Sequence, residues 1–270
     1  MKNSNFLFSF FLVLILSGIN PAQDTLSFKR NYLPYPDTTL VFLPDTYNLS
    51  ENFPAVILLN GWSGNYKQWN DIADLKTLAN KYNFIIVTPD GYYDSWYCNN
   101  IPRKNLQYEK FFIEDLLPEL FRKYKIDRTK LFISGLSMGG HGAMTLFIKY
   151  NDLFLSAGSM SGILDITKFP NKWGLQSVLG SYEKHMKIWN ENSAYHIVDS
   201  LKNSKKEFIV DCGTEDFAFG VNAKFFHKCK DLKLKITFIA RPGGHDRKYW
   251  AESILYHLDF FKRLLTKLKL

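Results

Sequence analysis

Short, strongly apolar segments that alternate with helical segments are the feature that most constrains the fold of this chain. Six segments have the composition of strands, and most contain three or more consecutive apolar residues: 39–43, 55–60, 84–88, 131–134, 208–212 and 235–240. Continuous apolar runs of this length are typical of strands that are covered on both faces. They therefore indicate a parallel sheet enclosed between helices.

Helical patterns lie between several of these predicted strands, at residues 71–82, 109–124 and 251–268. In the last of them, apolar residues recur at intervals of three and four and form one stripe. The stripe consists of Ile254, Leu258, Phe261, Leu265 and Leu268. Pro118 predicts a kink or a break in the second helix. Strand–helix alternation of this kind predicts an α/β fold with a mostly parallel central sheet and helices on both faces.

The first 22 residues have the features of an export signal. Lys2 precedes an apolar run at residues 6–16, and Ala22 follows Pro21 at a typical cleavage position. The run is shorter than the about 20 residues that a membrane-spanning helix needs, and a buried N-terminal helix is the alternative. We expect an exported protein, periplasmic or extracellular. Residues 23–270 have a length that suits a single domain with a full core.

Composition restricts the class of protein and its partners. A hydrophobic content of 46% and a charged content of 22% are typical of a globular protein, not of a disordered chain, collagen or a coiled coil. The net charge is +8, but the basic residues are spread along the chain with no nucleic-acid-binding motif beside them. We therefore expect a solvated basic surface and no nucleic-acid partner. No segment after the export signal is long enough to span a membrane.

The cysteine pattern gives no indication of a metal site. Cys98, Cys212 and Cys229 form no C-x-x-C pair, so we expect no cysteine-based zinc site, and no metal-ligand spacing links the histidines. We expect neither a metal nor an organic cofactor. Three cysteines allow at most one disulfide within the chain. The sequence leaves open which two of them pair, if any, and it also leaves the oligomeric state open.

The strongest local signal for function is the G-x-S-x-G segment centred on Ser137 (Gly135-Leu136-Ser137-Met138-Gly139). It follows a predicted strand and precedes a helical pattern, which is the context of a nucleophile elbow. The two glycines relieve crowding in the sharp turn. The N-terminus of the following helix favours a negative charge beside the serine. Ser137 is therefore the candidate nucleophile, and a glycine-rich turn with a passive serine is the alternative.

A serine nucleophile needs a base and an orienting acid. In α/β-hydrolases these follow in the order Ser, Asp or Glu, His. One predicted strand runs into a turn with Glu215 and Asp216, and a later strand runs into a glycine-rich loop with His245. The pattern does not decide between Glu215 and Asp216, and Asp211 is a third choice. We expect Asp246 to act as a turn or cap residue, and the other five histidines to be structural or solvated.

Two backbone amides are candidates for an oxyanion hole. One is the N–H of Met138, directly after the nucleophile, and the other comes from the loop after the strand at residues 55–60. A backbone donor there needs a non-proline residue just past a permissive glycine, and Trp62 follows Gly61. An ordinary turn at residues 60–65 is the alternative.

Five ordered segments together resemble the putative-esterase family of the α/β-hydrolase fold. That family includes S-formylglutathione hydrolases, tributyrin esterases, and feruloyl and acetylxylan esterases of carbohydrate esterase family 1, and the mycolyltransferases are more distant relatives. The segments are LLNGWSGNYKQW (58–69), TPDGYYDSWY (88–97), FISGLSMGGHG (132–142), DCGTEDF (211–217) and GGHDRKYW (243–250). They cover nearly all of the predicted mature chain.

The resemblance implies Ser137 as nucleophile, Asp216 as acid and His245 as base, with backbone donors at Met138 and Trp62. The choice of Asp216 over Glu215 rests on this resemblance.

The resemblance also implies that Trp96 and Tyr97 lie near the substrate cleft and contact the substrate, with a packed aromatic pair as the alternative. One departure is visible, because Asn60 stands where the family usually has a histidine before glycine.

These residues predict a secreted serine carboxylic-ester hydrolase that works through an acyl-enzyme. Export disfavours S-formylglutathione as the substrate and favours acetyl or feruloyl esters of polysaccharide, or small acyl esters. An acyltransferase to a sugar acceptor and a non-catalytic hydrolase-fold binding protein are the alternatives. Residues 162–206 form the one long irregular stretch, expected near the cleft. The motifs between residues 58 and 250 use almost all of the predicted mature chain and leave little for a large lid beyond this stretch, so we expect an open cleft.

Overall fold

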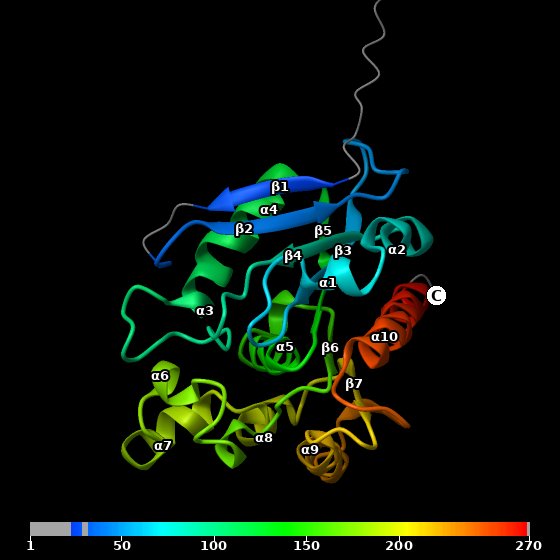
Figure 1. Cartoon of the computed structure of the whole chain (residues 1–270). Coiled ribbons are helices and arrows are strands. Elements are labelled where there is room, and N and C mark those ends of the chain that lie inside the picture. Colours follow the sequence, from blue (N-terminus) through cyan, green and yellow to red (C-terminus); the bar gives the residue numbers. More distant parts are fainter. Residues whose placement is uncertain (1–22, 29–31, 269–270) are drawn as a thin grey trace, which may run out of the picture.

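The computed structural model describes residues 23–28 and 32–268, so the predicted export signal lies outside the described residues. The described strands form one eight-stranded sheet in the order β1-β2-β4-β3-β5-β6-β7-β8 (Figure 1). Their bounds are β1 Asp24–Phe28, β2 Asp37–Phe42, β3 Phe53–Leu59, β4 Ile85–Pro89, β5 Ile126–Gly135, β6 Ser156–Met160, β7 Glu207–Gly213 and β8 Lys235–Arg241. All six predicted strands are present, with ends shifted by a few residues. The structure adds β1 and β6.

The sheet is mostly parallel, as predicted. β3 pairs in parallel with β4 and β5, and parallel pairing continues through β6, β7 and β8. β2 is antiparallel to both of its neighbours, β1 and β4. The parallel strands end at one edge, where α/β folds place their sites.

Helices cover both faces of the sheet (Figure 1). Their bounds are α1 Gln68–Ile72, α2 Leu75–Tyr82, α3 Tyr108–Phe111, α4 Leu117–Lys123, α5 Met138–Lys149, α6 Leu175–Leu179, α7 Tyr182–Glu191, α8 Ala194–Ile197, α9 Phe219–Asp231 and α10 Arg247–Lys267. Apolar residues of α2 and α10 pack on one face, and those of α3, α4, α5 and α9 pack on the other. The two layers of apolar side chains explain why the strand sequences are apolar throughout.

The last helix, α10, shows how the apolar stripe is used. Ile254, Leu258 and Phe261 are fully buried, and the Phe261 ring stacks on Phe132 of β5 with ring centroids 4.7 Å apart. Asp246 caps the helix by accepting a hydrogen bond from the Tyr249 amide at 2.9 Å, as expected. Leu268 is 58% exposed because it lies beyond the helix end, so the predicted stripe is one residue too long.

Two of the predicted helices are interrupted. The region around Pro118 begins as α3, widens into a π-helical segment at Phe112–Leu116 and continues as α4, with the proline in the first turn of α4. Proline lacks the amide that a regular turn would use, which explains the break. The helix predicted at residues 71–82 is two helices, because Asp74 caps α2 through the Thr77 amide.

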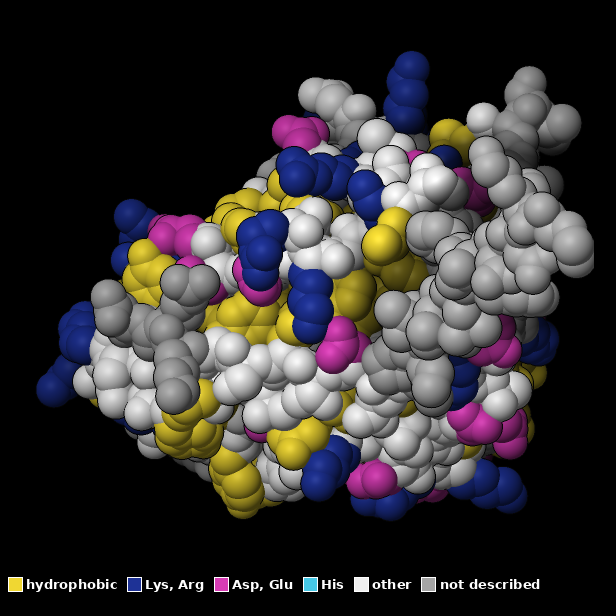
Figure 2. All heavy atoms as spheres, turned by 90° about the horizontal axis from the view of Figure 1, so that it is seen from above, with side chains coloured by type: hydrophobic (Ala, Val, Ile, Leu, Met, Phe, Trp, Pro, Cys, Tyr) yellow, Lys and Arg dark blue, Asp and Glu magenta, His cyan; other side chains and the backbone are white. Residues whose placement is uncertain are grey.

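Residues 162–206 form a series of short helices, α6 to α8, between β6 and β7, with no large lid (Figure 1). None of the described helices is both long and apolar enough to cross a bilayer. Cys98, Cys212 and Cys229 are buried free thiols, so they form no disulfide with one another. Figure 2 shows a face on which basic side chains lie among acidic, polar and hydrophobic ones, with no continuous basic patch.

Candidate active site

Ser137 lies in the sharp turn between β5 and α5, as the elbow pattern predicts. Its φ of +52° is in the left-handed region, where a non-glycine residue is strained. A Cβ at Gly139 would lie 2.2 Å from the Leu59 carbonyl oxygen, and one at Gly135 would lie 2.4 Å from the Gly139 carbonyl carbon. The elbow therefore packs so closely on β3 and on itself that only glycine fits at these two positions.

Ser137, His245 and Asp216 form a continuous chain of hydrogen bonds. His245 Nε2 is 2.9 Å from Ser137 Oγ, and its Nδ1 is 2.9 Å from Asp216 Oδ2. The Asp216 side chain is fully buried and also accepts a hydrogen bond from the Ala218 amide at 2.8 Å. Because Nδ1 faces a carboxylate, its proton is held there, which leaves the Nε2 lone pair directed at the serine hydroxyl.

The two other acids considered for the orienting role have different partners. Glu215 accepts hydrogen bonds from the Gly243 amide and from the Thr214 hydroxyl, so it holds the loop that carries His245. Asp211 is buried in β7 and bonds to the Tyr249 hydroxyl. Burial raises the pKa of Asp211 above its ordinary value. Of these acids, Asp216 is the one that contacts the histidine.

A pocket of about 160 Å³ opens in front of Ser137. Half of its lining residues are tryptophan or phenylalanine: Gly61, Trp62, Gln68, Trp96, Leu136, Ser137, Trp173, Phe217, His245 and Trp250. The His245 ring lies between Phe217 and Trp250, with ring centroids 4.4 and 5.0 Å away. Between these two rings, the His245 side chain is 19% exposed.

The candidate oxyanion donors flank this pocket. Met138 is the first residue of α5, and Trp62 lies in the loop after β3. Within the described part of the chain, neither amide donates a hydrogen bond to a backbone carbonyl. The Gln68 side chain accepts from the Gly61 amide at 2.7 Å, and the Ser63 amide donates to the Tyr93 carbonyl at 2.8 Å. These bonds hold the Trp62 loop in place on both sides.

Comparison with known proteins agrees with this geometry. A family model described as Putative esterase matches residues 31–261 of the chain.

The chain belongs to the Putative esterase family.

Its relatives are esterases and other serine hydrolases. An acetyl esterase of Caldicellulosiruptor saccharolyticus is 27% identical over 232 residues, which cover 80% of this chain and 85% of that protein. The structure of a ferulic acid esterase is similar with a TM-score of 0.78 and 26% identity, over 90% of this chain and 97% of that one. An S-formylglutathione hydrolase from Agrobacterium tumefaciens has a TM-score of 0.79 at 20% identity, over 90% and 95% of the two chains. The esterase therefore has the predicted α/β-hydrolase fold and is a serine hydrolase.

Trp96 and Tyr97 differ in position. Trp96 lines the pocket, and its indole N–H donates to the Trp173 carbonyl at 3.1 Å. Tyr97 does not line the pocket. Its hydroxyl donates to the Asn60 carbonyl at 2.8 Å, its ring packs against Gly142, and the residue is 1% exposed. The expectation that Tyr97 contacts substrate is therefore corrected: the residue lies beneath the site, where its hydroxyl bonds to the loop after β3.

Asn60, the departure from the family pattern, is part of the same support. Its side-chain oxygen accepts from the Gly91 amide at 2.8 Å, and its side-chain nitrogen donates to the Gly61 carbonyl at 3.0 Å. The side-chain carboxamide of Asn60 thus joins the loop after β3 to the loop after β4. The position of the Trp62 loop depends on these contacts.

Three aromatic residues of the pocket were not singled out from the sequence. Trp173 comes from the segment between β6 and β7, Phe217 follows the candidate acid, and Trp250 lies in the first turn of α10. Phe217 and Trp250 belong to the segments DCGTEDF and GGHDRKYW, which carry the family resemblance. Their place in these segments was the sequence signal that could have identified them as site residues. Trp173 had no signal beyond the aromatic content of residues 162–206.

Two of the remaining histidines are structural, as expected. Burial lowers the pKa of both His141 and His257 to about 3, so both rings are neutral at ordinary pH. His257 Nδ1 is 2.9 Å from Ser134 Oγ, which connects α10 to β5. No group of three or more metal-ligating side chains occurs in the described residues.

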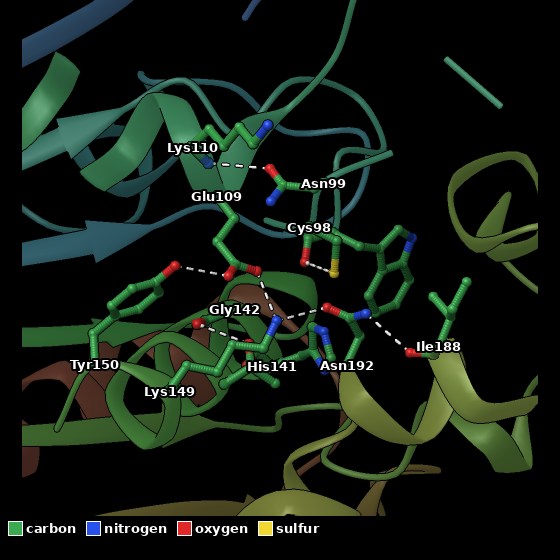
Figure 3. A network of polar contacts seen from close by, with 12 residues as sticks. Cys98, Asn99, Glu109, Lys110, His141, Gly142, Lys149, Tyr150, Ile188 and Asn192 are labelled. Carbon is green, nitrogen blue, oxygen red and sulfur yellow. Dashed lines mark hydrogen bonds and ion pairs between the residues drawn. The ribbon is translucent and has the colours of Figure 1, made fainter. Parts of the chain in front are cut away.

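Behind the elbow, a partly buried polar network ties α5 to its neighbours (Figure 3). Lys149, at the end of α5, donates to the Glu109 carboxylate at 2.6 Å and to the Asn192 side chain at 2.8 Å. Tyr150 donates to the same carboxylate at 2.9 Å. Glu109 belongs to α3, and Asn192 follows α7. One ammonium group therefore joins the elbow helix to the segment that carries Trp173.

Replacing Lys149 with methionine is expected to destabilise the esterase by about 1–3 kcal/mol, because the largely buried Glu109 carboxylate loses its cation. Thermal unfolding measures the change. Lys187→Met is the matched control, since the Lys187–Glu191 pair is exposed and should contribute less than about 0.5 kcal/mol. Equal effects of the two substitutions would contradict the stabilising role of the network.

Asp90 directly follows β4, and its carboxyl group should make the stability of the folded protein depend on pH. Burial raises the pKa of its carboxyl to about 6, while its oxygen accepts a hydrogen bond from the Tyr92 amide at 2.8 Å. The folded state therefore binds the proton more tightly than the unfolded state. The resulting stabilisation is complete below pH 4 and is lost as the pH rises through 6.

Asp90→Asn mimics the protonated carboxyl and keeps an acceptor oxygen. The variant should melt a few degrees above the wild type at pH 8 and close to it at pH 4. Melting curves at the two pH values test this, with exposed Asp231→Asn as the control. A variant less stable than the wild type at pH 8 would be the opposite of the expected result.

Proposed function

We propose that this esterase hydrolyses carboxylic esters through a Ser137–His245–Asp216 triad and an acyl-enzyme. The observation that carries the proposal is the unbroken chain of hydrogen bonds from the buried Asp216 through His245 to the strained Ser137. Such a chain is what a serine needs to attack a carbonyl at neutral pH.

Each group has a defined role in the proposed mechanism. His245 Nε2 takes the proton from Ser137 Oγ as the oxygen attacks the ester carbonyl, and Asp216 stabilises the imidazolium that forms. The amides of Met138 and Trp62 donate to the oxyanion of the tetrahedral intermediate. The intermediate collapses as His245 returns the proton to the leaving alcohol. Water then attacks the acyl-enzyme by the same route and releases the acid.

For the substrate, we propose acetyl or feruloyl esters of polysaccharide, or small acyl esters, hydrolysed outside the cytoplasm after export. The acetyl esterase and the ferulic acid esterase among the relatives support this choice. The export pattern at residues 1–22 supports the location. The pocket of about 160 Å³ is small and aromatic, which suits the acyl part of such an ester.

A panel of esters tests the substrate class. Purified protein would be incubated with acetylated xylan, methyl ferulate, p-nitrophenyl acetate and S-formylglutathione, and kcat/KM compared for each. The proposal predicts that the polysaccharide or feruloyl ester is hydrolysed at a higher kcat/KM than S-formylglutathione. A preference for S-formylglutathione would overturn the substrate class and keep the esterase chemistry. Formation of acyl-sugar in place of free acid would indicate the acyltransferase.

A further inference from the structure

A second cavity, of about 400 Å³, lies beside the candidate active site. We call it the tyrosine groove. Its defining residues are Tyr35, Tyr92, Tyr93, Asp94, Arg103 and Asn105. They come from the loops before β2, after β4 and before α3, none of which belongs to the triad. The groove is more than twice as large as the pocket in front of Ser137.

Residues that line the groove contact residues that line the pocket. The Tyr93 ring packs edge-on against Trp62, with ring centroids 4.9 Å apart, and Trp62 lines the pocket. On the other side, the Asp94 carboxylate lies within 3.2 Å of where a Cβ on Gly174 would be, directly after the pocket residue Trp173. A molecule large enough to occupy both cavities would therefore pass Trp62.

Two of the three tyrosines of the groove are exposed, and the third, Tyr92, is buried beside Tyr35. Tyr35 is 57% exposed and Tyr93 is 56% exposed, which is high for side chains of this size. The Tyr92 hydroxyl donates to the Tyr35 carbonyl at 2.7 Å, and the two rings lie 4.7 Å apart. Tyr92 has a φ of +54°, a strained conformation of the kind that is concentrated at binding sites. The groove thus presents preformed aromatic faces to the solvent.

The charges of the groove cancel. Arg103 bonds to the Asp94 carboxylate at 2.9 Å, so one cation and one anion form a pair. An anionic polymer such as a nucleic acid needs an excess of cations, which the groove does not offer. The Arg103, Asp94 and Asn105 side chains still supply hydrogen-bonding groups at its edge. Neutral aromatic faces bordered by polar groups match a sugar ring, which has C–H faces that pack on aromatic rings and hydroxyls around its rim.

We propose that the tyrosine groove binds the sugar units of a neutral polysaccharide, with Tyr35 and Tyr93 as the stacking platforms. The statement that this polysaccharide carries the hydrolysed ester rests on the proposed function. The acyl group would then occupy the pocket at Ser137, and the sugar chain would run past Trp62 into the groove. The groove would determine the alcohol specificity and the pocket the acyl specificity.

Binding of xylan that carries no ester tests the groove separately from the chemistry. The wild-type chain should be retarded in native gels that contain soluble de-esterified xylan. Tyr35→Ala/Tyr93→Ala should lose about tenfold in affinity, the combined effect of two aromatic contacts. Tyr35→Ala alone, which leaves the ring against Trp62 intact, should lose a few-fold. Tyr256→Ala, at a 44% exposed tyrosine of α10, is the matched control and should bind as the wild type does.

Kinetics add a second measurement. In Tyr35→Ala, KM for acetylated xylan should rise several-fold more than KM for p-nitrophenyl acetate, because the small ester has no sugar to bind.

A wild type that does not bind xylan, or a double variant that binds it like the wild type, would overturn the proposal that the groove binds sugar. If xylan binds but no ester is hydrolysed, the groove stands and the proposed function fails. If esters are hydrolysed but xylan does not bind, the proposed function stands and the proposal of a sugar-binding groove fails.

Discussion

Replacing Ser137 with alanine is expected to lower kcat for p-nitrophenyl acetate by at least about four orders of magnitude. Members of a catalytic triad act as a unit, so removal of the proposed nucleophile leaves His245 and Asp216 with nothing to activate. The fold should persist, because alanine removes only the hydroxyl at a position already held by the Ser137 amide, which donates to the Met160 carbonyl at 2.9 Å. Initial rates, with circular dichroism as a check on folding, measure the effect.

An exposed serine provides the control for this experiment. Ser200 lies on the surface in the segment between β6 and β7, and Ser200→Ala should keep the wild-type rate. A fluorophosphonate probe should label the wild type and Ser200→Ala, and it should not label Ser137→Ala. Wild-type turnover in Ser137→Ala would show that the nucleophile has been assigned to the wrong residue.

Asp216→Asn should reduce kcat by about 10,000-fold. An asparagine can present its NH₂ group to His245 Nδ1, which would favour the tautomer with a proton on Nε2 and remove the lone pair that faces Ser137. The adjacent acid is the matched control. Glu215 contacts the Gly243 amide and the Thr214 hydroxyl, not the imidazole, so Glu215→Gln should cost less than about tenfold in kcat.

The pair of variants separates the two acids that the sequence pattern left open. Single-turnover measurements of acylation give the clearest reading, because product release then does not enter the rate. A larger loss in Glu215→Gln than in Asp216→Asn would mean that the loop contact of Glu215, and not the bond to the histidine, limits catalysis.

The sequence predicted much of this architecture because the chemistry-bearing residues follow strand ends. Ser137 follows β5, Asp216 follows β7 and His245 follows β8, and parallel strands bring such ends to one edge of the sheet. The apolar strands and the stripe of α10 are signals of local sequence. The hydrogen bonds of the triad join residues 29 and 108 positions apart in the chain, which no spacing rule measures.

The features that the sequence did not predict depend on tertiary context. β6 reads Ser-Ala-Gly-Ser-Met and has no β-branched residue, yet it is wholly buried as a strand because β5 and β7 pair with it on either side. The family resemblance places both Trp96 and Tyr97 at the cleft. Both residues have positive φ values, and no sequence pattern gives the directions of side chains in such a loop. One ring consequently faces the pocket and the other lies beneath it.

The last helix, α10, which covers one face of the sheet together with α2, has a consequence for the order of folding. Eight of its side chains belong to the core on that face, and it follows every described strand in the sequence. During synthesis, β3, β4 and β5 therefore leave the ribosome long before the helix that shields them, and their apolar surface stays open to chaperones until then. In the exported protein that we propose, this delay would keep the strands competent for transport across a membrane.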